Sequence, residues 1–268
     1  LTLTAEGEPM LLRQLTLQSP TVLRSYEQVR AEYEAKGYTE AAGVLRQIEG
    51  EAARYKSSPT LYPLSDTSTC ATEPYVPSVI KLNTIGGTRW SYVGDYLEWS
   101  FEVPQSGLYQ IAVKARQNVT SGLVSSRRVL IDGSVPFAEM DSISFFYDSD
   151  WQSVVLGSGE EPYRFYLEAG THTLRMEVTL GDMGQVLGVT QDVLTQLNRI
   201  YREIIMLTGT SPDTMRNYRF EETLPETVEN IRTQCRVLES VRAALEEYTG
   251  QEDGNAAILG TLIRQLTV

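Results

Sequence analysis

The chain has 268 residues, of which 41% are apolar and 22% charged, a composition typical of a soluble protein that can build a sizeable core. Its formal net charge of -12 argues against nucleic acid or an anionic membrane surface as a partner. Its two cysteines, Cys70 and Cys235, lie far apart in different kinds of segment, so a disulfide-stapled fold is excluded. The sequence contains no run of eighteen apolar residues and therefore no predicted transmembrane segment. Because it starts at Leu1, we interpret it as a mature or excised piece of something longer.

The first predicted element is a helix over Pro20–Lys36. Ser19 followed by Pro20 is a typical helix start, because serine caps a helix and proline fits its first turn. Gly37 is a typical C-terminal stop. Apolar residues recur between them at intervals of three and four, which predicts one apolar helix face: Val22, Leu23, Tyr26, Val29 and Tyr33.

Short strands separated by turns are predicted from Ala41 to about Leu180. The clearest stretch is Gly94–Asn118, where apolar and polar residues alternate on both sides of a Pro104–Gly107 turn, so we expect a β-hairpin with two long arms. Many short strands with turns between them indicate an antiparallel β-sandwich. The other predicted strands are Val44–Glu49, Val79–Asn83, Arg127–Asp132, Ile143–Tyr147, Trp151–Leu156, Tyr163–Leu167 and His172–Leu180.

Beyond Gly181 the apolar pattern becomes helical. Two long segments carry apolar residues at alternating intervals of three and four, and such seams must be buried against each other or against a third helix. The helix at Pro20–Lys36 is a candidate third member. We therefore predict an α+β fold in which residues 1–40 form a helical segment packed with the C-terminal helices, residues 41–181 form a jelly-roll β-sandwich, and residues 182–268 form a helical hairpin plus a short helix. The two seams contain Val193, Leu197, Ile200, Ile204 and Leu207, then Leu224, Val228, Ile231, Cys235 and Leu238.

The sequence carries no recognisable catalytic motif. Its one histidine, His172, begins a predicted strand without a nucleophile elbow or a second histidine, and we interpret it as a packed or edge residue. Neither cysteine has metal-ligand spacing, and no glycine-rich phosphate loop is present. We therefore predict that the protein is not an enzyme.

Two groups of aromatic residues near predicted turns are candidates for a sugar platform. The apolar faces of a sugar ring stack on aromatic rings, while neighbouring polar groups bind its hydroxyls. The alternative is that most of these aromatics belong to the core. The candidate ligand residues are Arg89, Trp90, Tyr92, Arg127, Tyr147 and Trp151.

Glu49 and Glu51 form a candidate calcium site. Two residues apart on a strand, their side chains would share a face and lie within about 7 Å of each other. Carboxylate oxygens placed in this way suit Ca²⁺ if other oxygens converge on it. The alternatives are two solvated acids on an exposed face, or a pairing of Glu51 with an arginine such as Arg54 or Arg175.

A series of motifs resembles the carbohydrate-binding modules of the galactose-binding-like jelly roll, across about half of the chain. The resemblance implies a jelly-roll sandwich, a carbohydrate ligand and a structural calcium ion held by the E-x-E strand. The third acid of that site comes from a later strand in those modules, and Asp182 is the candidate for it here. The motifs are IEGE at 48–51, GDYLEW at 94–99, VPQSGLY at 103–109, DWQ at 150–152 and LEAGTHTL at 167–174.

A wider resemblance covers nearly the whole chain. It implies the middle region of a large extracellular solute-binding protein that serves an ABC-type sugar importer of gut and soil Gram-positive bacteria. The parent would be lipid-anchored at the cell surface, and its two solute-binding lobes, outside this chain, would be partners. The expected function is a non-catalytic carbohydrate-binding-like module, and the alternative is a structural spacer or docking module without a ligand. The stretches concerned are YKSSPTLYP at 55–63, ATEPY at 71–75, KLNTIGG at 81–87, ARQN at 115–118, SSRR at 125–128 and EIIMLTG at 203–209.

Overall fold

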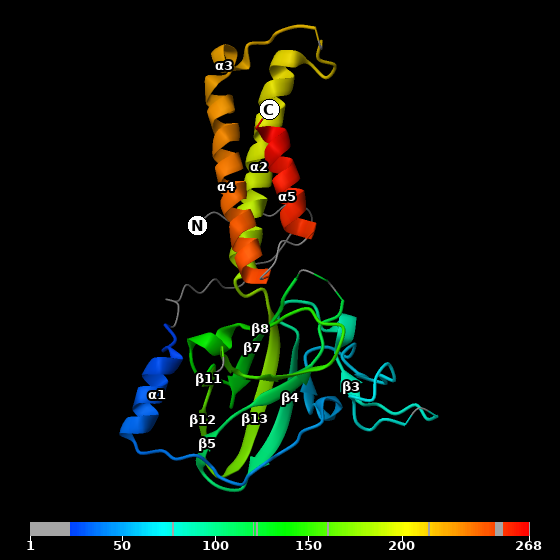
Figure 1. Ribbon diagram of the computed structural model, residues 1–268, viewed down its shortest axis with the longest axis vertical. Helices are drawn as coiled ribbons and strands as arrows, with labels where there is room; N and C mark the ends of the chain where they lie inside the picture. Colours follow the sequence, from blue (N-terminus) through cyan, green and yellow to red (C-terminus); the bar gives the residue numbers. More distant parts are fainter. Residues whose placement is uncertain are drawn as a thin grey trace, which may run out of the picture.

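The structure, a computed structural model, describes residues 22–76, 78–119, 121, 123–159, 161–213, 215–249 and 254–267. A β-sandwich forms one end of the molecule, and a stalk of three long helices rises from it (Figure 1). The last strand of the sandwich runs almost directly into the first stalk helix. The stalk helices are α2 (Met183–Thr208), α4 (Pro225–Thr249) and α5 (Gly254–Leu266).

The larger sheet of the sandwich has five antiparallel strands in the order β1-β4-β13-β7-β8. The strand β4 confirms the predicted alternation, because Leu97 and Trp99 are buried while Glu98 faces outward and pairs with Arg175 of β13 at 2.7 Å. The predicted antiparallel sandwich with flanking helices is therefore confirmed. The strand bounds are β1 (Tyr55–Lys56), β4 (Tyr96–Val103), β7 (Ser125–Ile131), β8 (Ile143–Phe145) and β13 (Gly170–Thr179).

Shorter strand pairs complete the sandwich. They are β2 (Pro63–Leu64) with β3 (Thr84–Ile85), β5 (Gly107–Tyr109) with β12 (Phe165–Leu167), β6 (Ala112–Ala115) with β9 (Gln152–Val155), and β10 (Gly157–Ser158) with β11 (Glu161–Pro162). The hairpin predicted over Gly94–Asn118 is wrong in its pairing. Its first arm, β4, pairs with β1 and β13, whereas β5 pairs with β12, so the turn carries the chain from one sheet to another.

The core of the sandwich lies between these layers. Leu97 and Val129 from the large sheet pack with Phe165 and with Phe137, and the four are almost inaccessible to solvent. The ring of Phe137, which precedes the short helix η3 (Ala138–Asp141), lies 5.5 Å from that of Phe165. Burial of these large side chains is the main source of the sandwich's stability.

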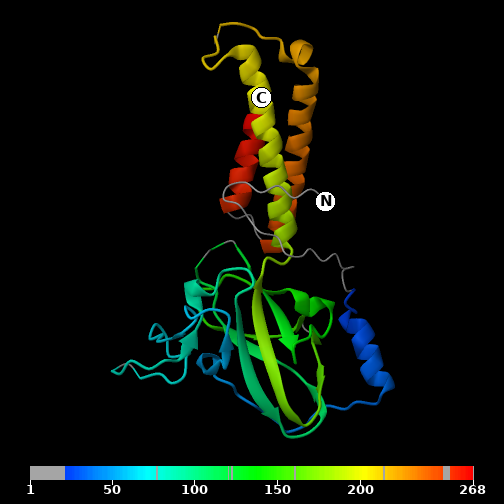
Figure 2. The same cartoon turned by 180° about the vertical axis from the view of Figure 1, so that it is seen from behind.

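The helix α1 (Tyr26–Ala35) lies beside the sandwich (Figures 1 and 2), so its predicted packing with the C-terminal helices is wrong. Tyr26 and Val29, three residues apart on one helix face, are buried in the sandwich core. The Tyr26 ring lies 4.6 Å from that of Tyr163, and the Tyr26 backbone N–H donates to a carboxylate oxygen of Glu139 at 2.8 Å. The helix is capped by Ser25; the predicted start at 19–20 lies outside the described residues.

Two further predicted strands are wrong. Residues 44–49 have no strand partner and lead instead into a 3₁₀ turn, η1 (Gly50–Ala52), and Leu45 is 86% exposed. Residues 79–83 belong to a long loop, where Ile80 is likewise 86% exposed. In each case a short apolar run resembles a strand in sequence but is largely exposed, and the strand that follows the second run, β3, begins only at Thr84.

The stalk confirms the two predicted helical seams. Val193 of α2, Leu238 of α4 and Ile263 of α5 meet in one buried cluster. A short helix, α3 (Phe220–Thr223), precedes α4. Within the described part of the chain, none of the helices has both the length and the apolarity needed to cross a membrane. The division at residues 40 and 181 into separate folding units stays a prediction.

Tyr248 ties the base of the stalk to the sandwich. Its hydroxyl lies 3.0 Å from Oγ of Ser126 on β7 and 3.2 Å from Oγ of Ser144 on β8. Close by, Gly181 adopts a left-handed φ of 53°, and a Cβ there would lie 2.2 Å from Oγ of Ser142. Glycine is favoured at this junction, because a side chain there would strain the backbone and force the Ser142 hydroxyl to move.

Candidate functional site

The structure brings together some of the predicted sugar-binding residues but not all of them. Trp90 and Arg127 are in direct contact, at the end of the sandwich from which the stalk rises. Trp151 is held in a separate polar network that belongs to a neighbouring loop. The six candidates therefore do not form one continuous platform.

Trp90 and Arg127 support each other. The guanidinium carbon of Arg127 lies 4.3 Å from the centroid of the Trp90 ring, and its Nη2 donates to the Trp90 carbonyl at 2.9 Å. The Trp90 indole N–H donates to the Asp95 carbonyl at 3.2 Å. A Cβ on Gly86 would lie 3.0 Å from the Trp90 ring, so the backbone of Gly86 closes on it as well. The Trp90 ring is therefore a structural element rather than an open stacking surface.

Arg127 is an unusual buried cation. Its side chain is 9% exposed, its Nη1 donates to Oγ of Ser125 and to the carbonyl of Ser126, and its buried Nε has no hydrogen-bond partner. Burial lowers the pKa of Arg127 to about 10 because the charged form is deprived of water. The Trp90 ring offsets part of that cost through a cation–π contact. Arg127 therefore holds the loop before β4 in place and does not present its guanidinium to solvent.

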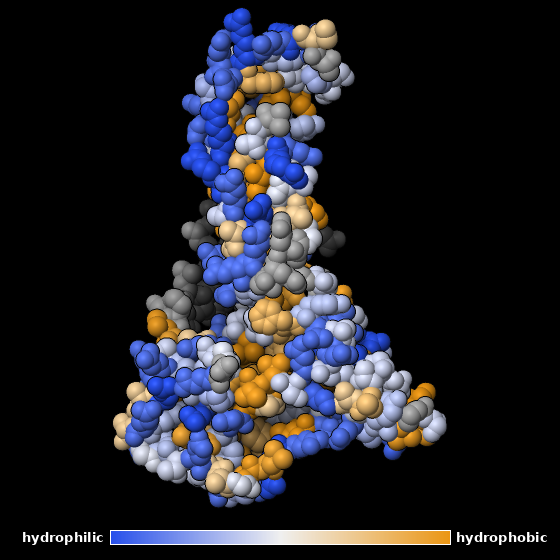
Figure 3. All heavy atoms as spheres, in the orientation of Figure 1, coloured by the Kyte–Doolittle hydropathy of each residue, from blue (hydrophilic) through white to orange (hydrophobic). Residues whose placement is uncertain are grey.

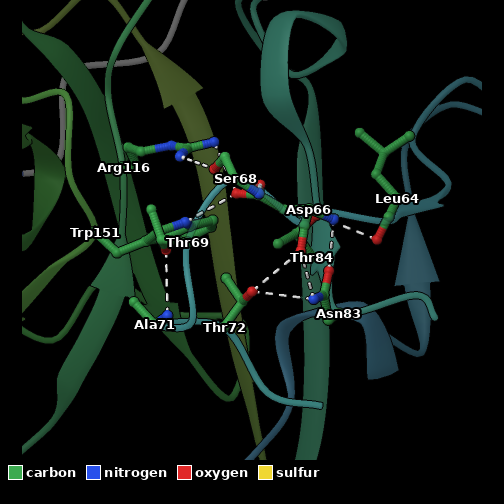
Figure 4. A network of polar contacts seen from close by, with 10 residues as sticks. All are labelled: Leu64, Asp66, Ser68, Thr69, Ala71, Thr72, Asn83, Thr84, Arg116 and Trp151. Carbon is green, nitrogen blue, oxygen red and sulfur yellow. Dashed lines mark hydrogen bonds and ion pairs between the residues drawn. The ribbon is translucent and has the colours of Figure 1, made fainter. Parts of the chain in front are cut away.

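Trp151 is anchored by Asp66. Its indole N–H donates to Oδ2 of Asp66 at 3.0 Å, and Arg116 pairs with the same oxygen at 2.8 Å (Figure 4). The guanidinium of Arg116 also lies over the Trp151 ring, 5.1 Å from its centroid. Burial alone would raise the pKa of Asp66, but hydrogen bonds from Ser68 and Trp151 and the charge of Arg116 lower it below its usual value.

A second part of this network holds the loop at residues 65–83. Asn83, which is 8% exposed, donates from Nδ2 to the Asp66 carbonyl at 2.8 Å and to Oγ1 of Thr72 at 3.0 Å (Figure 4). Its Oδ1 accepts from the Asp66 backbone N–H at 2.7 Å. Sequence reasoning missed this residue, because an asparagine that closes a loop across seventeen positions has no local pattern.

The open aromatic faces are those of Tyr92 and Tyr147. Tyr92 is 76% exposed and Tyr147 42% exposed. Arg89 stacks on a different ring, with its guanidinium carbon 4.4 Å from the centroid of Tyr62. Of the six predicted residues, these two tyrosines are the ones whose rings are available to a ligand.

The geometric reason for a calcium site at Glu49 and Glu51 is absent, because the residues do not lie on a strand. Glu49 accepts from Nε2 of Gln47 at 2.9 Å, and Arg175, proposed as a partner of Glu51, pairs with Glu98 instead. In the part of the chain that the structure describes, no group of three His, Cys, Asp or Glu is arranged to hold a metal ion.

Asp182 therefore does not join the two glutamates. Calcium binding stays a prediction that depends on the motif resemblance alone. Thermal melts with calcium and with a chelator test it, because an ion that binds only the folded state raises the melting temperature. Equal melting temperatures with calcium and with the chelator would show that the folded protein binds no stabilising calcium ion.

His172 lies near the start of β13, at the end of the large sheet away from the stalk. It connects the turn that follows β7, at Asp132, to the residues between β12 and β13, at Glu168. Its Nδ1 lies 2.7 Å from Oδ2 of Asp132, and its Nε2 lies 2.8 Å from the Glu168 carbonyl. Both partners are acceptors, so the geometry fits the imidazolium, which donates from both nitrogens. Partial burial lowers the pKa of His172, but the hydrogen bonds to Asp132 and Glu168 outweigh it, and the net pKa is raised.

We expect the protein to lose stability as the pH rises through the pKa of folded His172. A group whose pKa is raised on folding contributes fully below its unfolded pKa of about 6.5, and the contribution fades above the folded value. The loss is of the order of 1 kcal/mol, the net worth of such hydrogen bonds. Urea unfolding at pH 5.5 and pH 8.5 measures it. The His172→Gln variant should show a smaller difference between the two pH values, and an unchanged difference would contradict the assignment.

Comparison with known proteins separates the helical part of the chain from the sandwich. Residues 185–266, which span all but the first two residues of α2 and all of α4 and α5, match one family model. It is the bacterial solute-binding protein, 4-helix bundle domain. The match covers less than half of the chain, and it confirms the predicted resemblance for the stalk. No curated protein matches the chain.

Similar solved structures include enzymes and isolated carbohydrate-binding modules. A cycloisomaltooligosaccharide glucanotransferase of Paenibacillus sp., solved with cycloisomaltoheptaose, is 19% identical with a TM-score of 0.37, and the alignment covers 59% of this chain and 21% of that chain. A GH26-CBM35 β-(1,4)-mannanase of Podospora anserina is 15% identical with a TM-score of 0.35, covering 50% and 24%. A family 35 carbohydrate-binding module from Clostridium thermocellum is 15% identical with a TM-score of 0.32, covering 43% and 75%. All three TM-scores are low, so the evidence for the sandwich is the strands of this protein and their pairing rather than these structures.

Proposed function

We propose that this protein is an accessory region of an extracellular bacterial solute-binding protein of an ABC-type sugar importer, with a sandwich that is a non-catalytic carbohydrate-binding module. The match of residues 185–266 to the solute-binding protein 4-helix bundle domain carries the first part of this proposal. In this proposal the parent is lipid-anchored at the cell surface, and its two solute-binding lobes are the partners of the region described here.

The sugar-binding part of the proposal is supported by the motif series and by two open rings. Tyr92 and Tyr147 keep exposed faces at turns of the sandwich, whereas Trp90 and Trp151 are covered by arginine side chains. A tyrosine ring can stack on the apolar face of a sugar while its hydroxyl remains in water. The ligand would therefore be held at the surface rather than in a deep pocket.

A glycan array followed by calorimetry with plant and host oligosaccharides tests the sugar ligand. We expect Tyr92→Ala to weaken binding of the best ligand about tenfold, the loss of one aromatic stacking contact. Tyr201→Ala is the matched control, because Tyr201 is 62% exposed but lies on the stalk helix α2. Absence of binding to every oligosaccharide at millimolar concentration would overturn the sugar-binding role.

The second candidate function is a structural spacer without a ligand. One observation favours it: the Tyr248 hydroxyl contacts Ser126 and Ser144, so the stalk and the sandwich are joined by side chains as well as by the chain. Side-chain contacts between stalk and sandwich suit a module that positions other parts of a protein. Failure of the glycan test together with an intact fold would support the spacer.

A further inference from the structure

The loop at residues 65–83 carries exposed apolar side chains at its far end. It projects from the sandwich beside β3 in both views of the chain (Figures 1 and 2). The backbone N–H of Val79 donates to the Val76 carbonyl at 3.2 Å, so the chain turns back there. Val79, Ile80 and Leu82 follow this turn and are 52%, 86% and 54% exposed. We call these three side chains the apolar tip. Hydrophobic side chains are visible at the end of the same projection in Figure 3.

Two exposed tyrosines accompany the apolar tip. Tyr75 directly precedes the turn at Val76, and Tyr62 lies just before β2; their side chains are 39% and 44% exposed. A tyrosine combines an apolar ring with a polar hydroxyl, so it favours a boundary between apolar and aqueous surroundings. The loop therefore carries amphipathic aromatic side chains before its turn and aliphatic ones after it.

The base of the loop is held by the polar network already described (Figure 4). Asn83 bonds to Asp66 and to Thr72, and Trp151 and Arg116 both bond to Asp66. The apolar tip is therefore presented on an ordered support. Whatever covers the tip need not first order the loop, which is one of the main costs of association.

The loop and the side chains that contact its base carry more positive than negative charge, in a chain whose net charge is -12. Lys81 stands between Ile80 and Leu82 in the tip itself. Exposed charges more than about 8 Å away are largely screened at physiological ionic strength, so the acidic remainder of the chain acts only weakly at the tip. The basic residues concerned are Lys81, Arg89, Lys114 and Arg116, and the acidic ones are Asp66 and Glu73.

These features fit a bilayer surface better than a site on another protein. A protein would need a matching pocket for a convex projection, whereas a bilayer accepts one without a matching shape. Acyl chains accept aliphatic side chains, and the headgroup boundary favours tyrosine. A lysine extends its ammonium to lipid phosphates while its stem stays in apolar surroundings. The apolar tip, Tyr75 and Lys81 supply these three kinds of side chain.

We propose that the apolar tip inserts into the surface of a phospholipid bilayer, with Lys81 bound to lipid phosphates and the sandwich held beside the membrane. Insertion of three side chains is shallow, about 5–10 Å into the boundary between headgroups and acyl chains, and reversible. The net charge of -12 opposes adsorption of the whole chain to an anionic surface, so contact is made through the tip alone.

Sedimentation with vesicles made of equal parts of phosphatidylcholine and phosphatidylglycerol tests this insertion on the whole chain. We expect Ile80→Asp to lower the partition coefficient about tenfold or more, because a carboxylate does not enter the acyl region. Ile258→Asp is the matched control: Ile258 is 67% exposed on α5, so the same change of charge should leave the partition coefficient unaltered. Lys81→Ala should weaken binding about fivefold, the contribution of one basic residue at an anionic surface.

A fluorophore sensitive to polarity locates the contact. In a Cys70→Ser background, which leaves the buried Cys235, the fluorophore is attached to Ile80→Cys or to Thr67→Cys. Vesicles should shift the emission to the blue at position 80 and leave it unchanged at position 67, which is exposed near the base of the loop.

Other outcomes of the two measurements decide against insertion. Absence of vesicle binding by the unsubstituted chain overturns it, as does an equal loss of binding in Ile80→Asp and Ile258→Asp. A blue shift at position 80 that grows with protein concentration and needs no vesicles identifies a second copy as the occupant, which also overturns it. The vesicles contain no oligosaccharide, so the result is independent of the proposed sugar ligand.

Discussion

Replacing Phe137 with alanine is expected to lower the free energy of unfolding by about 3–5 kcal/mol, the usual cost of removing a fully buried aromatic ring. The Phe137 side chain is 0% exposed. Its ring lies 4.9 Å from that of Tyr26, 5.1 Å from that of Tyr163 and 5.5 Å from that of Phe165. Truncation therefore opens a cavity where α1 meets the core of the sandwich, and the surrounding rings cannot close it without losing contacts with each other.

Urea unfolding followed by tryptophan fluorescence measures this loss. Phe146→Ala is the matched control, because Phe146 is 55% exposed and its loss should change the free energy of unfolding by about 0.5 kcal/mol or less. Hydrogen exchange adds a local readout: amides of α1 should lose protection in Phe137→Ala and keep it in Phe146→Ala. Similar free-energy losses in both variants would contradict the assignment of Phe137 to the core.

The sequence predicted those elements whose pattern is local. Alternation along Tyr96–Val103 identified β4 because a strand in a sandwich has one buried face. The helical seams at Val193 and Leu238 were likewise readable from their spacing. The pairing of the strands, by contrast, could not be predicted from the sequence. The turn at Pro104–Gly107 indicates where a strand ends, but not that the next strand joins a different sheet.

The same limit explains the error about α1. Tyr26 and Val29 mark an apolar face at helical spacing, and that face fits a helical bundle or the edge of a sandwich equally well. Ring contacts of Tyr26 with Phe137 and Tyr163 place the helix against the sandwich. Both residues lie more than a hundred positions further along the chain, so no local pattern reveals them.

The candidate sugar platform was only partly predictable for a related reason. An aromatic residue near a turn has the same sequence context whether its ring is open or covered. Trp90 is covered by Arg127 of β7, and Trp151 by Arg116, which directly follows β6. Each arginine lies more than thirty residues along the chain from the tryptophan that it covers. Arg127 was also expected among exposed polar groups, since burial of a charge without a carboxylate partner is costly and rare.

Asn83→Ala is expected to release the loop at residues 65–83 and to lower the free energy of unfolding by about 3 kcal/mol. Each buried group left without its partner costs about 1–3 kcal/mol. The substitution deprives the Asp66 backbone N–H and carbonyl and the Thr72 hydroxyl of their bonds to Asn83 (Figure 4). Some of that loss is recovered by water, because the loop can open where a core residue cannot.

Limited proteolysis separates this effect from a general loss of stability. The loop carries the exposed residues Val79, Ile80 and Leu82, so its release should create a cleavage site there under conditions in which the rest of the sandwich stays folded. Asn118→Ala is the matched control, because Asn118 is exposed. Cleavage of Asn83→Ala at the same rate as the unsubstituted protein would show that Trp151, Arg116 and Asp66 hold the loop without Asn83. Because Asp66 bonds both to Trp151 and to Asn83, we instead expect the loop to depend on both halves of the network.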